Sequence, residues 1–200
     1  LKDLGIKTVG HLASTPLDIL KRRFGIWGDL MQRHARGIDD GKVEPPGVAR
    51  SISRENTFGV DTRDNAFLEA TLRNLSERVG ADLRGRGKQA RCVTLKLRYA
   101  DFTTITRQRT LTQSDNSDRL IFETGLNLLK AALLSDRSPV RLIGIGVSGL
   151  VEANRQLDML DSSGWRSEQL DKAVDRIRDK YGFNAIQTGR SLRLKEIFHP

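Results

Sequence analysis

The sequence predicts an α+β protein, in which a small helical unit precedes a split β-α-β domain with a four-stranded sheet and two helices. Three observations support this. Glycine turns separate short helical stretches over residues 1–37, and a proline- and glycine-containing linker occupies residues 38–49. Strand and helix patterns then follow in the order β-α-β-β-α-β over residues 50–151. Residues 152–200 are expected to form a C-terminal extension.

The first 37 residues are expected to form three short helices joined by glycine turns. The first helix covers residues 8–13, Pro16 suits the first position of the second, and the third covers residues 29–36. The turn before the third helix reads Gly-Ile-Trp-Gly over residues 25–28. Turns of this kind are typical of helix-hairpin-helix units, whose backbone N–H groups hold a DNA phosphate. A plain small helical bundle is the alternative.

The linker contains Pro45, Pro46 and Gly47, which block both helix and central strand, so a domain boundary is expected there. After it we expect strands over residues 50–58, 93–99, 103–111 and 140–150, and amphipathic helices over residues 63–84 and 117–134.

The segment over residues 93–99 alternates most clearly between apolar and polar side chains. Its inward side chains are expected to be Val93, Leu95, Leu97 and Tyr99. Because a split β-α-β arrangement packs both helices on one sheet face, the other face is left free. That face is expected to carry Lys96, Arg98, Thr104 and Thr106.

The extension is expected to begin with an irregular polar segment over residues 151–164. A charged helix follows over residues 165–181, with Leu170, Val174 and Ile177 along one side, so we expect that apolar side to dock on another element. Residues from 182 onward are left unassigned.

The charge balance favours a polyanionic partner. The 34 Lys and Arg residues against 25 Asp and Glu residues give a formal net charge of +9, and phosphate contacts by such cations release condensed counterions. A basic surface kept for solubility is the alternative. Basic residues cluster over residues 83–91 and 106–109, beside the sheet face that carries Lys96 and Arg98. Few aromatic residues interleave them, which favours a grip on duplex backbone over stacking of single-stranded bases.

Several other classes of site are not favoured by the sequence. Cys92 has no partner cysteine, which excludes a disulfide within the chain and fits the cytoplasm. The spacing of His and Cys residues predicts no metal site, and no apolar run approaches the ~20 residues that span a bilayer. The G-x-G-x-x-G spacing over residues 144–149 lies inside a strand pattern, so we reject a dinucleotide site. The pair Asp39 and Asp40 is read as a turn, and no catalytic residue is assigned.

Five stretches of the sequence resemble Y-family translesion DNA polymerases of the DNA polymerase IV type. KLRYADFTTITR (residues 96–107), RSISRENTF (50–58) and VRLIGIGVSGL (140–150) resemble the little-finger domain, which holds DNA. LGIKTVGHL (4–12) and ARGID (35–39) resemble the thumb domain and its exit. The resemblance implies a DNA-directed DNA polymerase, a nucleotidyltransferase of damage bypass, DNA repair and translesion synthesis. It also implies a catalytic palm with Mg²⁺, which would precede Leu1, so the chain is expected to be a fragment.

The resemblance and the sheet pattern together give the candidate DNA contacts. The resemblance implies little-finger contacts with the DNA backbone at Ser51, Ser53, Arg54, Thr57, Thr106, Arg107 and Arg141, and the basic face adds Lys96, Arg98 and Arg109. The thumb turns place Gly5, Lys7, Gly25 and Gly28 toward the primer–template DNA. Relatives often have arginine where Leu142 and Gly146 stand, so the last strand is expected to grip DNA more weakly.

The stretch QLDML resembles the peptide by which bacterial polymerases bind the sliding clamp. Its residues are Gln156, Leu157, Met159 and Leu160, and the usual aromatic position is either filled by Asp161 or displaced to Leu160. A surface loop that binds nothing is the alternative.

The function expected from these features is the DNA-gripping portion of a translesion polymerase, acting as a monomer on primer–template DNA, away from membranes. Two alternatives remain open: a non-catalytic DNA- or clamp-binding module derived from such a polymerase, and an RNA-binding α+β domain. The sheet lacks the stacking aromatics that are usual in the RNA-binding class.

Overall fold

The computed structural model describes residues 1–45, 47–153 and 162–189, with the side chains of 162–166 left out. The chain divides into two compact units, Leu1–Gly47 and Val48–Pro200, and each is described by itself. None of the described helices is long and apolar enough to cross a membrane.

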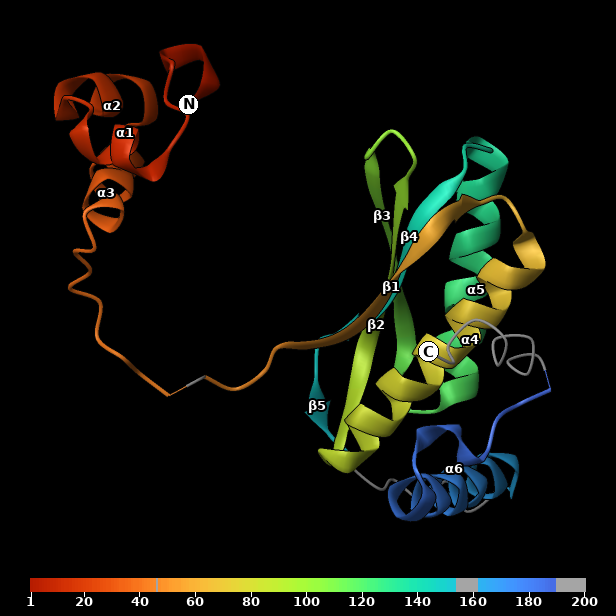
Figure 1. Ribbon diagram of the computed structural model, residues 1–200. Helices are drawn as coiled ribbons and strands as arrows, with labels where there is room; N and C mark the ends of the chain where they lie inside the picture. Colours follow the sequence, from red (N-terminus) through yellow and green to blue (C-terminus); the bar gives the residue numbers. More distant parts are fainter. Residues whose placement is uncertain (46, 154–161, 190–200) are drawn as a thin grey trace. The chain divides into compact units, whose positions relative to one another are not determined.

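The first unit is a cluster of short helices. The 3-10 helix η1 (Lys2–Leu4) is followed by α1 (Val9–Ser14), α2 (Leu17–Phe24) and α3 (Ile26–Ala35) (Figure 1). Ile6 and Leu20 are its buried apolar residues. The buried side chain of Gln32 donates from Nε2 to the carbonyl oxygen of Thr15, which ties α3 to the turn between α1 and α2.

The turn between α2 and α3 is shorter than the sequence predicts. Gly25 alone makes it, with φ at 60°, whereas the predicted turn residue Gly28 lies in the first turn of α3 and is buried. A Cβ atom at Gly28 would lie 2.4 Å from the carbonyl oxygen of Leu20, so glycine is needed there because α2 and α3 touch. The assignment of Gly28 to the turn was therefore wrong.

The second unit has the predicted split β-α-β order. Its elements are β1 (Ser51–Thr62), α4 (Asn65–Gly85), β2 (Lys88–Tyr99), β3 (Thr104–Asp115), α5 (Asp118–Ser135) and β4 (Val140–Ser148). The strands pair antiparallel in the spatial order β1-β4-β2-β3. Two details differ from the prediction. β1 continues past a register shift to Thr62, and a fifth strand, β5 (Val151–Glu152), pairs with the start of β2 where an irregular segment was expected.

Helices α4 and α5 cover one face of this sheet (Figure 1). The inward residues of β2 are Val93, Leu95, Leu97 and Tyr99, and all are at most 1% exposed. They pack against apolar side chains of both helices, among them Leu68, Leu72, Ile121 and Leu129. Burial of this face leaves the opposite face of the sheet uncovered by helices in the described part of the second unit.

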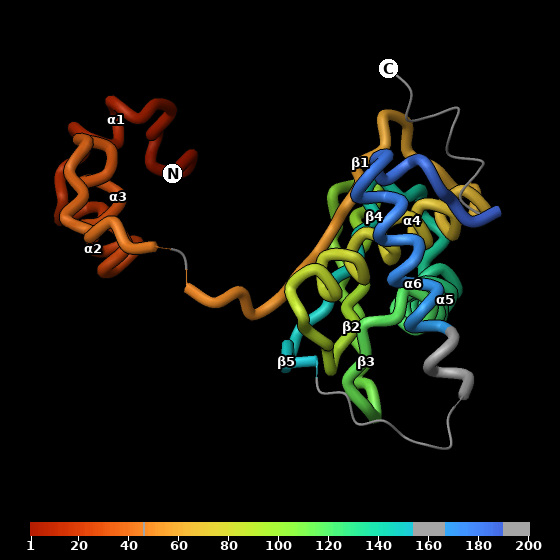
Figure 2. The backbone as a smooth tube through the Cα atoms, turned by 90° about the horizontal axis from the view of Figure 1, so that it is seen from below, coloured from red at the N-terminus to blue at the C-terminus, as the bar shows by residue number. Residues whose placement is uncertain are grey.

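The C-terminal helix α6 (Ser162–Tyr181), followed by the 3-10 helix η2 (Phe183–Ala185), lies beside α4 and α5 (Figures 1 and 2). Its docking does not depend mainly on the predicted apolar stripe, because Leu170 is 63% exposed, Ile177 is 38% exposed and Val174 is half-buried. The contacts instead come from Asp171, Asp175 and Arg178, which share the inner side of the helix. The helix docks through ion pairs.

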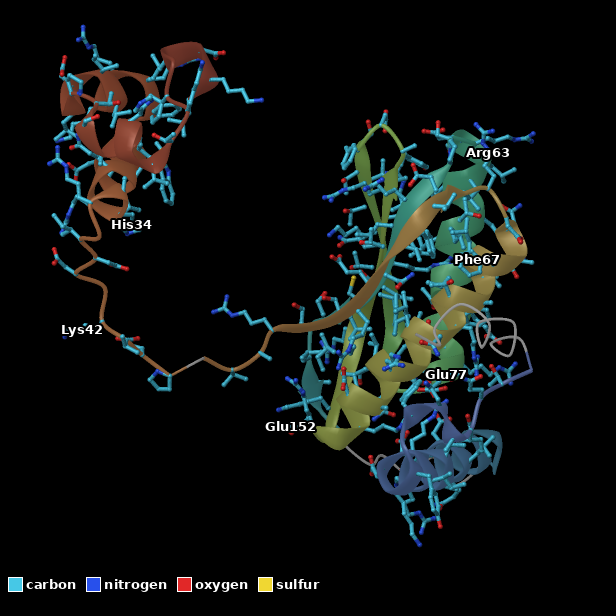
Figure 3. All side chains as sticks on the ribbon, in the orientation of Figure 1. His34, Lys42, Arg63, Phe67, Glu77 and Glu152 are labelled. Carbon is cyan, nitrogen blue, oxygen red and sulfur yellow. The ribbon has the colours of Figure 1, made fainter. Side chains whose placement is uncertain are left out.

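These ion pairs form a buried cluster that joins three helices. The Arg84 guanidinium on α4 contacts Asp118 of α5 at 2.8 Å and Asp175 of α6 at 2.6 Å. Arg178 of α6 reaches the buried Glu77 of α4 at 2.5 Å (Glu77 is marked in Figure 3). Arg84 was predicted to belong to a basic cluster beside the free sheet face, which was wrong. Its side chain is 7% exposed and its charge is used inside the fold.

Gly80 makes room for this cluster on α4. A Cβ atom there would lie 2.0 Å from Oδ1 of Asp118 and 3.0 Å from a terminal nitrogen of Arg84. Buried charges are costly unless they are paired, so the cluster stabilises the fold only while its geometry is kept.

Replacing Gly80 with alanine is expected to destabilise the second unit, although alanine normally favours a helix interior. The helix preference would contribute about 1 kcal/mol in favour of alanine, whereas displacing Asp118 is expected to cost on the order of 1–3 kcal/mol. Gly85→Ala is the matched control, because no heavy atom lies within 4 Å of a Cβ built at Gly85. Urea unfolding measures both variants, and equal effects would contradict this account of the cluster.

Burial also makes the cluster sensitive to pH. Burial raises the pKa of Asp118 to about 6, and the neighbouring Arg84 opposes the shift only in part. The unfolded chain has an ordinary aspartate pKa near ~3.9. Between these values the folded state binds more protons than the unfolded state, so the contribution of Asp118 to stability falls as the pH rises from about 4 to about 6.

We expect the free energy of unfolding of the wild type, relative to Asp118→Asn, to fall by up to about 3 kcal/mol between pH 4 and pH 7. The asparagine keeps an acceptor for Arg84 but does not titrate. Denaturant unfolding of both proteins at several pH values measures the difference. A constant difference over this range would show that folding does not raise the pKa of Asp118.

Candidate nucleic-acid interface

The uncovered face of the sheet is lined by hydroxyl groups, small residues and two cations. The strand pairing fixes its composition, because directly paired residues point to the same side. One row across the sheet contains Glu55, Gly144, Lys96 and Thr106, and the next contains Thr57, Leu142, Arg98 and Thr104. The expected placement of Lys96, Arg98, Thr104 and Thr106 on one face is thus confirmed. Toward the other end lie Ser51, Ser53, Thr94, Gln108, Thr110, Gly146 and Ser148.

The middle of this face, which we call the sheet hollow, is a depression of about 310 Å³ whose lining includes Ser53, Thr94, Lys96, Thr106 and Gly146. Its floor is low because β4 carries glycines on this side. A Cβ atom at Gly146 would lie 3.0 Å from that of Ser53, so any larger residue would crowd β1. Gly144 and Gly146 are thus glycines inside a strand that allow the neighbouring backbone to approach closely.

Of the two cations on the free face, one is paired with an acid and the other with a neutral hydroxyl group. Lys96 Nζ lies 2.7 Å from a carboxylate oxygen of Glu55, and Arg98 Nε donates to Thr104 Oγ1 at 2.9 Å. Serine and threonine hydroxyls both donate and accept, so this face offers many hydrogen bonds with a moderate positive charge.

Three predicted contact residues do not lie on this face. Arg54, Arg107 and Arg109 pair with Ile145, Leu95 and Val93, which are core residues, so these arginines leave the two edge strands on the helix side. Arg54 makes a two-nitrogen contact with Asp82 of α4, at 2.9 and 2.7 Å. All three are exposed and therefore flank the sheet hollow as edge cations.

Arg141 lies at one end of the sheet, where the pairing of β2 with β4 shifts register. Its guanidinium stands 4.7 Å from the ring centre of Phe102 and 3.5 Å from Asp61. Phe102 is 61% exposed and has a left-handed backbone, with φ at 68°. This exposed aromatic at the end of the sheet was missed by the sequence analysis, because neither its φ nor its exposure has a sequence signal.

In the first unit, the turn glycines do not themselves present free donors. The N–H of Gly5 donates to Lys2 O, that of Gly25 to Lys21 O and that of Gly28 to Gly25 O. The free donors expected at the α2–α3 turn are the N–H groups of Ile26 and Trp27, because the first residues of a helix have no partner within it. Lys7 is exposed beside the Gly5 turn.

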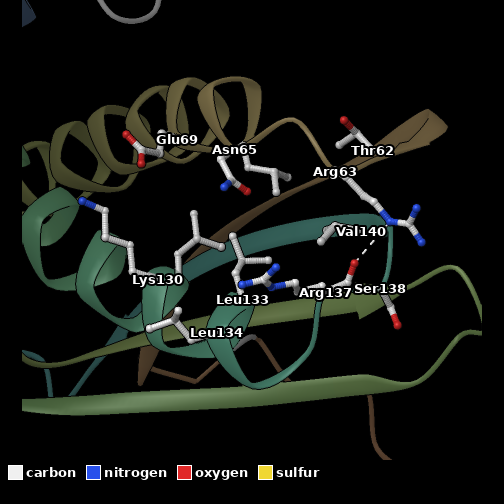
Figure 4. Close-up of a pocket in the computed structure, with 12 residues that line it drawn as sticks. Thr62, Arg63, Asn65, Glu69, Lys130, Leu133, Leu134, Arg137, Ser138 and Val140 are labelled. Carbon is white, nitrogen blue, oxygen red and sulfur yellow. Dashed lines mark hydrogen bonds between the residues drawn. The ribbon is translucent and has the colours of Figure 1, made fainter.

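A second cavity, of about 590 Å³, lies between the ends of α4 and α5 (Figure 4). Leu68, Leu129, Leu133 and Leu134 make it largely apolar. Arg63, which also lines it, donates from Nε to the carbonyl oxygen of Arg137. None of the predicted contact residues lines it.

Among the described residues, no three His, Cys, Asp or Glu side chains are arranged to hold a metal ion. The Mg²⁺ that the resemblance implies therefore does not fit the described part of the chain. The predicted clamp-binding residues Gln156, Leu157, Met159 and Leu160 lie outside the described residues.

Comparisons with known proteins all point to one family. Residues 49–159 match the impB/mucB/samB family C-terminal domain. The chain is 50% identical over 198 residues to a DNA polymerase IV of Dehalococcoides mccartyi, covering 99% of this chain and 50% of that protein. It is 36% identical to "DNA polymerase IV 1" of Mesorhizobium japonicum, covering 98% of this chain and 45% of that one. The chain thus spans about half the length of these curated relatives.

A solved structure shares the fold. A Y-family DNA polymerase chimera aligns with a TM-score of 0.51 and 18% sequence identity, over 76% of this chain and 43% of the other. The α+β arrangement of the second unit therefore agrees with that of a Y-family polymerase.

Proposed function

This chain belongs to the impB/mucB/samB family of Y-family DNA polymerases of the polymerase IV type, and we propose that it holds the backbone of primer–template DNA without reading its sequence. The sheet hollow and the cations at its edges form the main contact surface. The turn between α2 and α3 contributes a second contact from the first unit.

The observation that carries this proposal is the composition of the one sheet face that the helices leave free. Hydroxyl groups of Ser51, Ser53, Thr94 and Thr106 line it, with Lys96 and Arg98 among them and Arg54, Arg107 and Arg109 at the edges. Hydroxyl and guanidinium donors bind phosphate oxygens irrespective of base. No aromatic side chain lies among the paired residues of this face, which favours duplex backbone over stacked single-stranded bases.

The activity of the whole protein follows as a further part of the proposal. The relatives are named DNA polymerase IV, so we infer translesion synthesis and a role in DNA repair, with the metal-dependent chemistry outside the residues described in this structure. We further propose that it acts as a monomer in the cytoplasm and that residues 156–160 bind a sliding clamp. The identity to named polymerases gives no support to a non-catalytic module.

We expect the 200-residue chain to bind unrelated duplexes with equal affinity that falls steeply with salt. Arg98→Ala removes a cation from the free face and is expected to weaken binding about 3- to 10-fold and to lower the salt slope by about 1 on every sequence. Arg119→Ala on α5, whose side chain is 76% exposed, is the control and is expected to change neither. Fluorescence anisotropy measures both, and binding that is insensitive to salt would contradict the proposal.

Arg107→Ala tests the contribution of the edge cations. Because Arg107 is exposed and leaves β3 on the helix side, we expect a smaller loss than for Arg98→Ala, about 2- to 3-fold, again equal on unrelated duplexes. A larger loss than that of Arg98→Ala would place the backbone over the β3 edge and not over the sheet hollow. The same anisotropy titration, carried out on both variants, decides between the β3 edge and the sheet hollow.

A further inference from the structure

A second basic depression lies between α4 and α6, and we call it the helix groove. Its volume is about 950 Å³, larger than that of the sheet hollow. Cations from both helices line it, including Arg78 and Arg86 near the end of α4 and Arg176 on α6, against the acids Asp82, Asp175 and Asp179. No function discussed above accounts for these residues.

Part of the positive charge in the helix groove is used by the fold, and part is not. Arg84 is paired with Asp118 and Asp175, and Arg178 with Glu77. For Arg78, Arg86 and Arg176, no ion pair is found among the described residues. These three cations of the helix groove take no part in the buried ion-pair cluster, so they can bind an anion.

Arg78 shows that this charge is only partly compensated locally. Its guanidinium lies 4.1 Å from the ring centre of Phe183 and donates to Asn74 Oδ1, a neutral acceptor. Burial lowers the pKa of Arg78, and the positive charges of Arg54 and Arg178 lower it further. The carboxylates of Asp82 and Glu77 oppose this shift but do not cancel it. An anion in the helix groove would relieve this repulsion.

The helix groove and the sheet hollow meet at one residue. Arg54 lines both depressions, and it stands on β1, which forms an edge of the sheet. A strand of phosphates could therefore pass from the free face, around the β1 edge at Arg54, and into the helix groove that contains Arg78, Arg86 and Arg176. A duplex could not follow this path, because its persistence length is about 150 base pairs. A single strand is flexible enough to turn around the edge.

The lining of the helix groove suits phosphates better than bases. Its aromatic side chain, among the described residues, is Phe183, whose ring already has the guanidinium groups of Arg78 and Arg178 4.1 Å from its centre. Bases therefore find no free ring to stack on, whereas the arginines offer planar donors for phosphate oxygens.

We propose that the helix groove binds the phosphate backbone of a single-stranded DNA segment that continues from the duplex held on the sheet hollow. This inference rests on the proposed function, since Arg54 joins the two surfaces. The helix groove would be a second DNA-binding surface, on the helix side of the domain, and its ligand would be single-stranded DNA.

The test compares a blunt duplex, the same duplex with a 12-nucleotide single-stranded extension, and the 12-nucleotide strand alone. We expect the extension to raise the affinity of the wild-type chain about 5- to 10-fold and to steepen the salt dependence by about 0.7 for each phosphate contacted. In the double variant Arg86→Glu/Arg176→Glu, the gain in affinity from the extension should fall below about 2-fold. Its affinity for the blunt duplex should change no more than that of the control variant described below.

The control is Lys130→Glu/Arg137→Glu, which makes the same change in net charge at exposed residues beside the apolar cavity. All four altered residues are exposed, and thermal unfolding of each variant checks the fold.

The outcomes separate this inference from the proposed function. If blunt duplex binds but the extension adds nothing, or if both double variants lose the gain equally, the helix groove does not bind single strands and the proposed function stands. If blunt duplex does not bind while the single strand binds through Arg86 and Arg176, the proposed function fails and the groove assignment stands. If decaglutamate binds in an Arg86- and Arg176-dependent manner and the single strand does not, the groove is a site for an acidic peptide and the inference is overturned.

Discussion

The burial of one face of β2 is the constraint on which the rest of the second unit depends. Val93, Leu95, Leu97 and Tyr99 must lie under α4 and α5, and the period of two in a strand then sends Thr94, Lys96 and Arg98 to the opposite side. A shift of one residue would bury Lys96 and Arg98 without partners, at a cost of several kcal/mol each. The same requirement that builds the core therefore builds the surface proposed to hold DNA.

The ionic cluster has a comparable double role. Arg84 and Arg178 consume the carboxylates of Glu77, Asp118 and Asp175 to fix α6 against α4 and α5. Acids that are used inside the fold cannot neutralise the cations left on its surface. The docking of α6 thus both forms one wall of the helix groove and leaves Arg78, Arg86 and Arg176 available to an anion.

Periodicity in the sequence predicted the order of elements, the inward face of β2 and the position of Lys96 and Thr106 on one face, because each depends on local alternation. It did not predict that Arg84 is buried, since its partner Asp175 lies 91 residues away. It also misread Gly28, because a glycine needed for close approach looks the same as one needed for a turn. The helix-side position of Arg107 follows from the same alternation, because its neighbour Thr106 lies on the free face. Arg107 had been assigned to the contact residues from the family resemblance and not from this alternation.

The most direct test of the central claim is the residue-by-residue response of the chain to duplex DNA. In ¹H–¹⁵N NMR spectra of the 200-residue chain titrated with a blunt duplex, the largest amide shifts are expected at Ser53, Thr94 and Thr106, on three different strands of the free face. Shifts concentrated on α5 around Lys130, with these three unchanged, would contradict the assignment of the sheet hollow as the DNA-holding surface.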